Sequence, residues 1–338
     1  MRLHNWSAPG LSLRSRITMD VLAATWRPLT AVLPSGRLGT LISRKLIAGG
    51  LAFASPPVRG ATFTPVEQPS ADGPIVRGEW VRTPATDRTD GVVLYIHGSG
   101  YVVCSARTHR GLTSQIAART GHPVFSIDYR LAPNNAYPAA PQDVRAAWDW
   151  LLAQGHDPSR IVVAGDSAGG HLALTLVLGL ARAHEPLPAA VVTLSPVIDL
   201  DLARSAVRDR VEHDPFASPH VARRVMAHYA DDAARSDEGL RIAFDDIDAF
   251  PPTLVHAGSR EMLAADCTEL ARRIRAAGFP VEHRVWPGLM HVFQAMTALM
   301  PESNRALDEI ADFIGVHLTD VAQSPVAATI PTQEAATA

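Results

Sequence analysis

The sequence predicts an α/β fold in which helices cover both faces of a mostly parallel sheet. From residue 75 to residue 316, short apolar β-like runs alternate with longer stretches of helical character. This alternation is typical of strand–helix–strand units, which form parallel sheets. A length of 338 residues and an apolar content of 47% are sufficient for a sizeable core, and a charged content of 19% indicates a globular chain.

The elements follow one another in a regular order after a helical start. Pro28, Pro34 and Pro56-Pro57 divide the first 60 residues into helical pieces without an internal repeat. The β-like runs that follow are Ile75–Val81, Val92–Ile96, Val124–Asp128, Ile161–Ala164, Val191–Ser195, Leu254–Ala257 and Val281–Trp286. The helix-like stretches are His109–Thr120, Pro141–Gln154, Gly169–His184, Asp266–Ala277 and Glu302–Val316.

The alternation is interrupted once and ends before the last residues. Residues 201–248 are charged and too long for an ordinary connection, so we expect an inserted helical segment there. The predicted core therefore comprises residues 61–200 and 249–320. Residues 321–338 lack periodicity, which predicts a disordered tail.

Composition excludes several classes of function. A net charge of −3 is too small to recruit nucleic acid or an anionic membrane surface. The two cysteines, Cys104 and Cys267, form neither a disulfide framework nor a metal-ligand spacing, so a reduced, cytoplasmic setting is expected. No apolar run is long enough for a membrane helix. The segment RKLIAGGLAFASPP imitates a secretory signal, which keeps secretion or membrane association open, but it starts at residue 44, too far from Met1.

The glycine-rich turn Gly165–Gly170 joins a β-like run to a helix-like run, and two mechanisms compete for it. In a dinucleotide fingerprint, Ser167 would occupy the place of the glycine that touches the pyrophosphate, and Glu185 is not at the end of the next strand. Gly165-Asp166-Ser167-Ala168-Gly169 fits a nucleophile elbow, in which a strained turn exposes the serine hydroxyl. The pentapeptide alone is also compatible with a structural serine in a tight turn.

A serine nucleophile requires a base and an acid, which follow it in the chain order serine, acid, histidine. His291 lies in a turn after the last β-like run and is the predicted base. The acid is expected in the loop after Leu254–Ala257, where Glu261 is close to the end of the run. Asp266, further along and within the predicted helix, is the alternative acid.

An oxyanion hole is expected after an early strand. His97-Gly98-Ser99-Gly100 follows the run Val92–Ile96, and backbone N–H groups of such a turn can converge on a developing negative charge. The residue after the nucleophile, Ala168, supplies one more N–H group. A glycine-rich turn after a strand is often only a turn, but here it occurs with the elbow, the acid and the histidine in the right order.

Taken together, these segments resemble the hormone-sensitive-lipase-like esterases of the α/β-hydrolase fold over about residues 75–317. HGSG is similar to the oxyanion motif of that family, and GDSAGG is similar to its nucleophile motif. DYRLAPNNAYPAAPQD is similar to its Asp-Tyr-Arg-Leu-Ala-Pro stretch and the Pro-Ala-Ala segment after it. SPVIDL and DPFASP resemble the entry and the interior of its cap insertion. The sequence departs from the family pattern at Ser99, where a glycine is usual, and at Glu261, where an aspartate is usual. Asn134 also replaces an acidic residue.

The resemblance implies a cap made of residues 1–60 and 201–248 over an apolar pocket. It implies hydrolysis of short- to medium-chain acyl esters by Ser167, His291 and Glu261, with oxyanion donors at Ser99, Gly100 and Ala168. His97, Gly98 and Asp166 are expected to support the loops and Tyr101 to line the pocket mouth. Neither a metal nor a cofactor is needed, and a homodimer is compatible with the family. A catalytically weak binding protein and an amidase or peptidase remain the alternatives.

Overall fold

The sheet has eight strands in the order β1-β2-β4-β3-β5-β6-β7-β8. The computed structural model describes residues 10–32, 36–70, 73–231 and 234–319. Strands β1 and β2 pair antiparallel with each other, β2 pairs antiparallel with β4, and the pairs from β4 to β8 are parallel. The prediction of a mostly parallel sheet is therefore confirmed. The strand bounds are Thr62–Gln68, Val76–Arg82, Val92–Ile96, Val124–Ile127, Ile161–Asp166, Ala190–Leu194, Thr253–Gly258 and Val281–Trp286, from β1 to β8.

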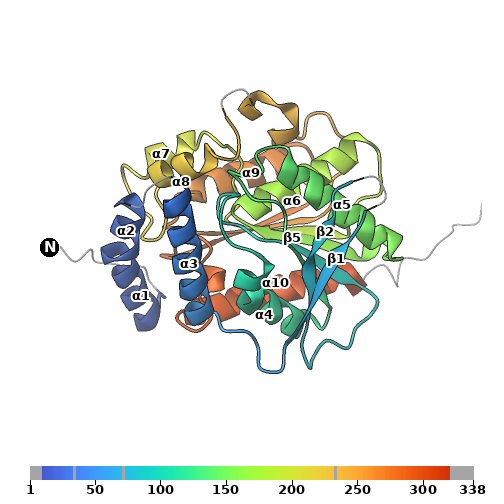
Figure 1. Cartoon of the computed structure of the whole chain (residues 1–338), viewed down its shortest axis with the longest axis horizontal. Helices are drawn as coiled ribbons and strands as arrows, with labels where there is room; N and C mark the ends of the chain where they lie inside the picture. Colours follow the sequence, from blue (N-terminus) through green and yellow to red (C-terminus); the bar gives the residue numbers. More distant parts are fainter. Residues whose placement is uncertain (1–9, 33–35, 71–72, 232–233, 320–338) are drawn as a thin grey trace, which may run out of the picture.

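Helices cover both faces of this sheet (Figure 1). On one face, α4 packs on β2 and β4, α10 packs on β5 and β6, and the two helices contact each other. On the other face, α5 packs on β2, α6 packs on β5 and β6, and α9 packs on β7 and β8. These five helices are Arg110–Thr120 (α4), Ala139–Ala153 (α5), Ala168–Arg182 (α6), Ala264–Ala276 (α9) and Pro301–Thr319 (α10). Side chains of β3 alternate between the two layers: Leu94 and Ile96 join one core cluster, Val93 and Tyr95 the other. All five residues of β3, a central strand, are buried, as expected for a sheet that is covered on both faces.

Two further groups of helices lie together at one side of the molecule (Figure 1). The first group is N-terminal: α1 (Leu13–Ala24), α2 (Trp26–Val32) and α3 (Arg37–Ala54). The second comes from the expected insertion: α7 (Ala203–Arg208) and α8 (Pro219–Met226), followed by the short 3₁₀ turns Ala234–Ser236 (η3) and Glu238–Leu240 (η4). Pro28 does not interrupt α2, because it lies in the first turn, where a backbone N–H is not needed. Pro34 and the predicted disordered tail lie outside the described residues.

The beginning and the end of the chain are joined by hydrogen bonds. The N–H of Ser12 donates to Glu302 Oε1 at 2.7 Å, and the Ser12 hydroxyl donates to Oε2 at 3.1 Å. Ser15 also donates to this carboxylate. Because Glu302 is in the first turn of α10, its negative charge is favourably placed at the helix N-terminus. These contacts hold α1 against α10.

The strand register brings the carboxyl ends of β3, β5, β6 and β7 to one edge. Ile96 is opposite Gly165, Asp166 is opposite Leu194, and Leu194 is opposite His256. In parallel α/β sheets, ligand sites form outside this edge. Trp286, at the end of β8, is opposite Gly258 at the end of β7. The loops that follow these strands and β8 contain all the residues predicted to act on a substrate.

Candidate active site

Ser167 stands at the sharp turn between β5 and α6. Its backbone has φ 51° and ψ −117°, a conformation that non-glycine residues rarely adopt. The glycines on either side allow the strand and helix to approach. A Cβ on Gly165 would lie 2.5 Å from the carbonyl oxygen of Gly169, and a Cβ on Gly169 would lie 2.0 Å from that of Ile96. The turn has the strained geometry that the nucleophile-elbow interpretation requires.

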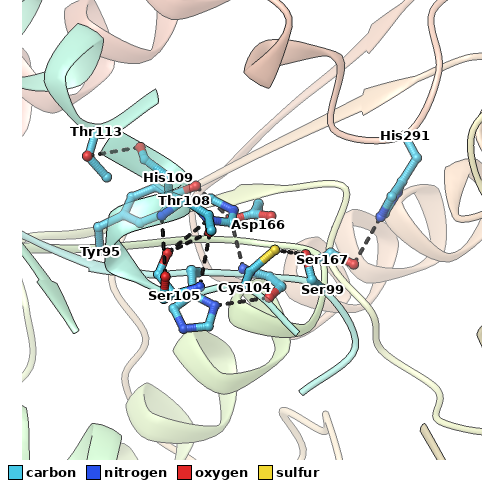
Figure 2. A network of polar contacts seen from close by, with 12 residues as sticks. Tyr95, Ser99, Cys104, Ser105, Thr108, His109, Thr113, Asp166, Ser167 and His291 are labelled. Atoms are coloured by element: carbon cyan, nitrogen blue, oxygen red, sulfur yellow. Dashed lines mark hydrogen bonds and ion pairs between the residues drawn. The ribbon is translucent and has the colours of Figure 1, made fainter. Parts of the chain in front are cut away.

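The imidazole of His291 reaches Ser167 from the loop after β8. Its Nε2 lies 2.9 Å from Ser167 Oγ, which is hydrogen-bond distance, and Figure 2 shows the two side chains directed at each other. Both residues are buried. Residues 124 positions apart in the chain are therefore brought to the distance that proton transfer needs.

Glu261 lies on the other side of His291. Its Oε1 is 3.9 Å from His291 Nδ1, longer than a hydrogen bond but within the range of an ion pair. The second oxygen, Oε2, accepts hydrogen bonds from the Ser195 hydroxyl at 2.6 Å and from the N–H of Gly258 at 2.8 Å. The Glu261 side chain is completely buried, so its carboxylate is held in place by these donors. Ser195, which sequence reasoning did not select, also accepts from the N–H of Val292 beside the histidine.

The alternative acid has other partners. Asp266 Oδ2 accepts a hydrogen bond from the Ser205 hydroxyl at 2.8 Å, and Oδ1 lies 3.6 Å from Arg204. Both partners belong to α7 in the inserted segment. Asp266 thus fixes α7 to α9, and its carboxylate is engaged away from the imidazole.

The charges around His291 favour its protonated form. Burial lowers the pKa of this histidine, but the carboxylates of Glu261, Asp214 and Asp166, with Glu261 foremost, together raise it by more. The net pKa lies above 6.5, the ordinary value. An imidazole in this setting can hold a proton taken from a serine hydroxyl.

The turn after β3 is the predicted source of oxyanion donors. Ser99 has φ 83° and Gly100 has φ 65°, and both line the same cavity as Ser167. Within the described residues, the N–H groups of Ser99 and Gly100 have no hydrogen-bond acceptor. Ala168 is the first residue of α6, where backbone N–H groups have no acceptor within the helix. Three unsatisfied donors are therefore available near the serine.

Asp166 supports this turn through its carboxylate (Figure 2). Its Oδ1 accepts hydrogen bonds from the Tyr95 hydroxyl at 2.7 Å and from the N–H of Gly98 at 3.0 Å, and it lies 3.4 Å from His109 Nε2. A Cβ on Gly98 would lie 2.2 Å from Asp166 Oδ2, so only glycine fits. Burial raises the pKa of Asp166, but His109 and the Tyr95 hydroxyl are the main groups that lower it, and the net shift is downward, which favours the ionised carboxylate.

His97 also orders the turn. Its ring stacks on Tyr129 at 4.3 Å with an interplanar angle of 17°, and Nδ1 lies 3.1 Å from the carbonyl oxygen of Gly98. Burial lowers the pKa of His97 to about 3, so the ring is neutral. Tyr95, His109 and Tyr129 were not selected from the sequence. A tyrosine or histidine in a buried run gives no local signal that distinguishes such a role from ordinary packing.

Tyr101 occupies a different place from the one expected. We predicted it at the pocket mouth, but its side chain is completely buried and does not line the cavity at Ser167. Its ring stacks on Tyr229 at 3.8 Å with an interplanar angle of 7°. The positive φ of Tyr101, 63°, directs the side chain away from the cavity and toward the inserted segment.

A cavity of about 180 Å³ lies above Ser167 and His291 and is mostly apolar. The core contributes Ser99, Gly100, Met262 and Met296. The N-terminal helices contribute Trp26, Thr30, Ile47 and Leu51, and the inserted segment contributes Phe216, Val221, Val225 and Met226. A second cavity of about 110 Å³ adjoins it and shares Thr30, Ile47, Val103, Val221 and Val225 with it. The walls are suited to an apolar chain next to the serine.

The apolar side chains of α3 are divided between the surface and the cavity. Leu41, Ile42 and Leu46 are exposed, whereas Ile47 lines the cavity and packs against the core. Leu38 lies among the side chains that the structure does not describe.

Asp214 is a second buried carboxylate near His291 that sequence reasoning did not select. Its Oδ2 accepts from the N–H of Met262 at 3.0 Å, and Oδ1 accepts from the N–H of Phe216 at 2.8 Å. Burial raises the pKa of Asp214 to about 6, although the charge of His291 opposes the rise. The residue ties the inserted segment to the loop that carries Glu261. The only signal in the sequence is its position in DPFASP.

Several known proteins are similar to this chain. A family model described as the alpha/beta hydrolase fold matches residues 93–295. The carboxylesterase/phospholipase LipF of Mycobacterium tuberculosis is 37% identical over 278 residues, covering 80% of this chain and 73% of LipF. An esterase of Acinetobacter venetianus is 35% identical over 239 residues, covering 70% of this chain and 78% of the relative. The crystal structure of an esterase from the bacterial hormone-sensitive lipase family superposes with a TM-score of 0.79 at 34% identity, covering 89% of this chain and 98% of that one.

Proposed function

Since the chain belongs to the α/β-hydrolase family, and within it to the hormone-sensitive-lipase-like esterases, we propose that it hydrolyses carboxylic esters with Ser167, His291 and Glu261. It is a serine ester hydrolase; the individual roles of the residues are our assignment. The 2.9 Å contact between Ser167 Oγ and His291 Nε2 carries this assignment.

In the acylation step, Ser167 Oγ attacks the ester carbonyl carbon while His291 Nε2 takes the hydroxyl proton. The negative charge of Glu261 stabilises the resulting imidazolium. The N–H groups of Ser99, Gly100 and Ala168 stabilise the oxyanion of the tetrahedral intermediate. His291 then donates its proton to the leaving alkoxide, and the alcohol departs from the acyl-enzyme.

Deacylation repeats these steps with water as the nucleophile. His291 removes a proton from the water as it attacks the acyl carbon, the oxyanion donors act again, and the carboxylic acid leaves as Ser167 recovers its proton. The apolar cavity beside Ser167 supports an acyl chain of short to medium length, because a longer chain would have to leave the space of about 180 Å³.

The two helical segments that line this cavity, residues 13–54 and 203–240, are proposed to act together as a cap. No helix in the described ranges is long and apolar enough to cross a bilayer. A cytoplasmic setting and a homodimer stay predictions from the sequence. Size-exclusion chromatography with light scattering tests the homodimer, and a monomeric mass would contradict it.

The test is a fluorophosphonate probe together with p-nitrophenyl esters of increasing acyl length. We expect labelling and turnover in the natural protein, with both lost in Ser167→Ala, and kcat/KM falling beyond medium chains. Glu261→Gln should lower kcat by about 10²- to 10⁴-fold, as loss of the orienting acid does elsewhere. Asp266→Asn serves as the matched control, and its kcat should stay within a few-fold of that of the natural protein. Near-normal turnover by Glu261→Gln would overturn the assignment of Glu261 as the acid.

Two alternatives have different outcomes in the same experiment. A binding protein would show neither labelling nor turnover, although the close serine–histidine contact does not favour it. An amidase or peptidase would cleave matched p-nitroanilides at rates comparable to the esters.

A further inference from the structure

The turn that carries the proposed oxyanion donors is strained along most of its length. Ser99, Gly100, Tyr101 and Cys104 all have positive φ angles, between 63° and 83°, and three of the four are not glycine. Such conformations persist only where surrounding contacts hold them. The contacts that hold this turn therefore decide where its N–H groups point.

Some of these contacts lie within the turn, and one comes from the loop after β4. The carbonyl oxygen of Tyr101 accepts from the N–H of Ala132 at 3.0 Å, and the Ser99 hydroxyl accepts from Cys104 Sγ at 2.9 Å. The carbonyl oxygen of Ser99 accepts from the N–H of Val103 at 3.3 Å. None of these three bonds involves the helical segments that line the cavity.

The two helical segments that line the cavity also contact the turn. Arg44 of α3 donates to the carbonyl oxygen of Val102 from Nε at 3.1 Å and from Nη2 at 2.8 Å. Gly100 faces Val225 of α8 so closely that a Cβ on the glycine would lie 2.8 Å from Val225 Cγ1. The ring of Tyr101 stacks in parallel on Tyr229 at 3.8 Å.

The Tyr101–Tyr229 pair is held by ring packing and not by its hydroxyls. Both side chains are less than 2% exposed, and neither phenolic oxygen has a hydrogen-bond partner within the described residues. Tyr229 is itself fixed, because its carbonyl oxygen accepts from the N–H of Tyr137 at 2.8 Å and the Tyr137 ring meets it edge-on at 85°. A fixed flat ring thus presses on the residue adjacent to Gly100.

We propose that Tyr229 is a positioning residue for the oxyanion hole: its ring, stacked on Tyr101, holds the 99–101 turn in the conformation that aims its N–H groups at the substrate carbonyl. The inference rests on the proposed function. If Tyr229 has this role, the inserted segment contributes to the rate enhancement and also forms a wall of the pocket. Loss of the ring should act on the transition state, where the oxyanion is charged, more than on the bound ester.

The experiment compares Tyr229→Leu, which removes the flat ring, with Tyr229→Phe, which keeps it. With p-nitrophenyl butyrate we expect Tyr229→Leu to lower kcat by at least tenfold with KM changed less than threefold, and Tyr229→Phe to stay within twofold. Complete loss of one oxyanion donor lowers kcat by about 10²- to 10³-fold, and this is the upper limit for a donor that is only displaced. Affinity for a trifluoromethyl ketone, which forms a tetrahedral adduct, should fall in parallel with kcat, whereas affinity for butyrate should not.

A matched control is Phe216→Leu, another cap aromatic, which lines the cavity and whose ring contact within the described residues is with Trp26, at 5.7 Å, and not with the turn. It should change KM more than kcat. Tyr101→Leu should mimic Tyr229→Leu, and the double variant should be no worse than either, because both remove one interaction. Circular dichroism checks folding; if Tyr229→Leu does not melt cooperatively, Tyr229→Met, which fills the space without a flat ring, takes its place.

Several results would overturn the proposal. An effect of Tyr229→Leu confined to KM would make the residue a wall of the pocket only. Equal losses in Tyr229→Phe and Tyr229→Leu would assign the effect to the hydroxyl. Additive losses in the double variant would mean that the two rings act separately. Failure of the proposed function is distinguishable from all of these, because the natural protein itself would then not hydrolyse the ester.

Discussion

At the scale of single residues, the site depends on a neutral histidine whose surroundings favour its charged form. Burial lowers the pKa of His291, and Glu261 with two further carboxylates raises it by more. Glu261 can act in this way because Ser195 and the N–H of Gly258 hold its carboxylate in a completely buried position. The same charge that stabilises the imidazolium during acylation therefore reduces the fraction of active enzyme in acid.

The first prediction concerns this balance. Since the reaction needs neutral His291 and its pKa is raised, kcat/KM should decline as the pH falls through a value above 6.5, the ordinary histidine pKa. Glu261→Gln removes the main charge that raises the pKa, so the acid limb should move to lower pH while the plateau drops. Initial rates with p-nitrophenyl butyrate from pH 5 to pH 9 measure both effects. An acid limb that stays in place in Glu261→Gln, or moves equally in Asp266→Asn, would contradict the assignment.

At the scale of elements, the close packing of β5, α6 and the turn after β3 puts the serine and its donors in register. The second prediction tests that packing with two glycines of the same helix. Gly169→Ala should prevent folding or abolish labelling of Ser167, because the added Cβ would lie 2.0 Å from the Ile96 carbonyl oxygen. Gly179→Ala, with no atom within 4 Å of its Cβ, should instead stabilise the protein by about 0.5–1 kcal/mol through the better helix propensity of alanine.

Thermal unfolding with probe labelling measures both glycine variants. A Gly169→Ala protein that melts and labels like the natural one would show that the elbow tolerates a looser fit than the structure indicates. A Gly179→Ala protein that is strongly destabilised would mean that this position of α6 is covered by a contact.

The regular elements could be predicted because their periodicity is local. The bounds of β3 and β8 agree with the runs Val92–Ile96 and Val281–Trp286, and the serine turn is apparent from its glycines. Strand β1 was missed: Thr62–Gln68 contains Pro65 and has no buried residue, features of an edge strand without a clear alternation. Tyr101 was misplaced because the direction of its side chain depends on a positive φ that the sequence does not reveal. Ser195 and Asp214 were missed because their partners are distant in the chain.

At the scale of the whole molecule, several histidines are buried in their neutral form. Burial lowers the pKa of His171 to about 4 and those of His97 and His256 to about 3. In the unfolded chain they titrate near 6.5. The contribution of these histidines to the free energy of unfolding is therefore fully present above pH 6.5. It is lost as the pH falls toward 4, because the unfolded state then binds more protons than the folded state. Asp214, whose pKa is raised, has the opposite effect and offsets part of the loss.

The third prediction follows for His171, whose Nε2 lies 3.0 Å from the carbonyl oxygen of Leu240 in the inserted segment. The free energy of unfolding should decrease between pH 7.5 and pH 5, and His171→Gln should reduce this decrease by about 1–2 kcal/mol. Urea denaturation at the two pH values measures it. His220→Gln, at an exposed position, is the control; an equal reduction there, or none in His171→Gln, would refute the explanation.

The hydrogen bonds from Ser12 and Ser15 to Glu302 have a consequence for synthesis on the ribosome. The chain is made from its N-terminus, so α1 emerges roughly 290 residues before the carboxylate that receives it. Helix α1 is therefore translated long before the helix that it packs against, α10. Until then its apolar side chains stay without their final neighbours, and nascent chains arrested before residue 302 should be more readily cleaved in α1 than the released protein.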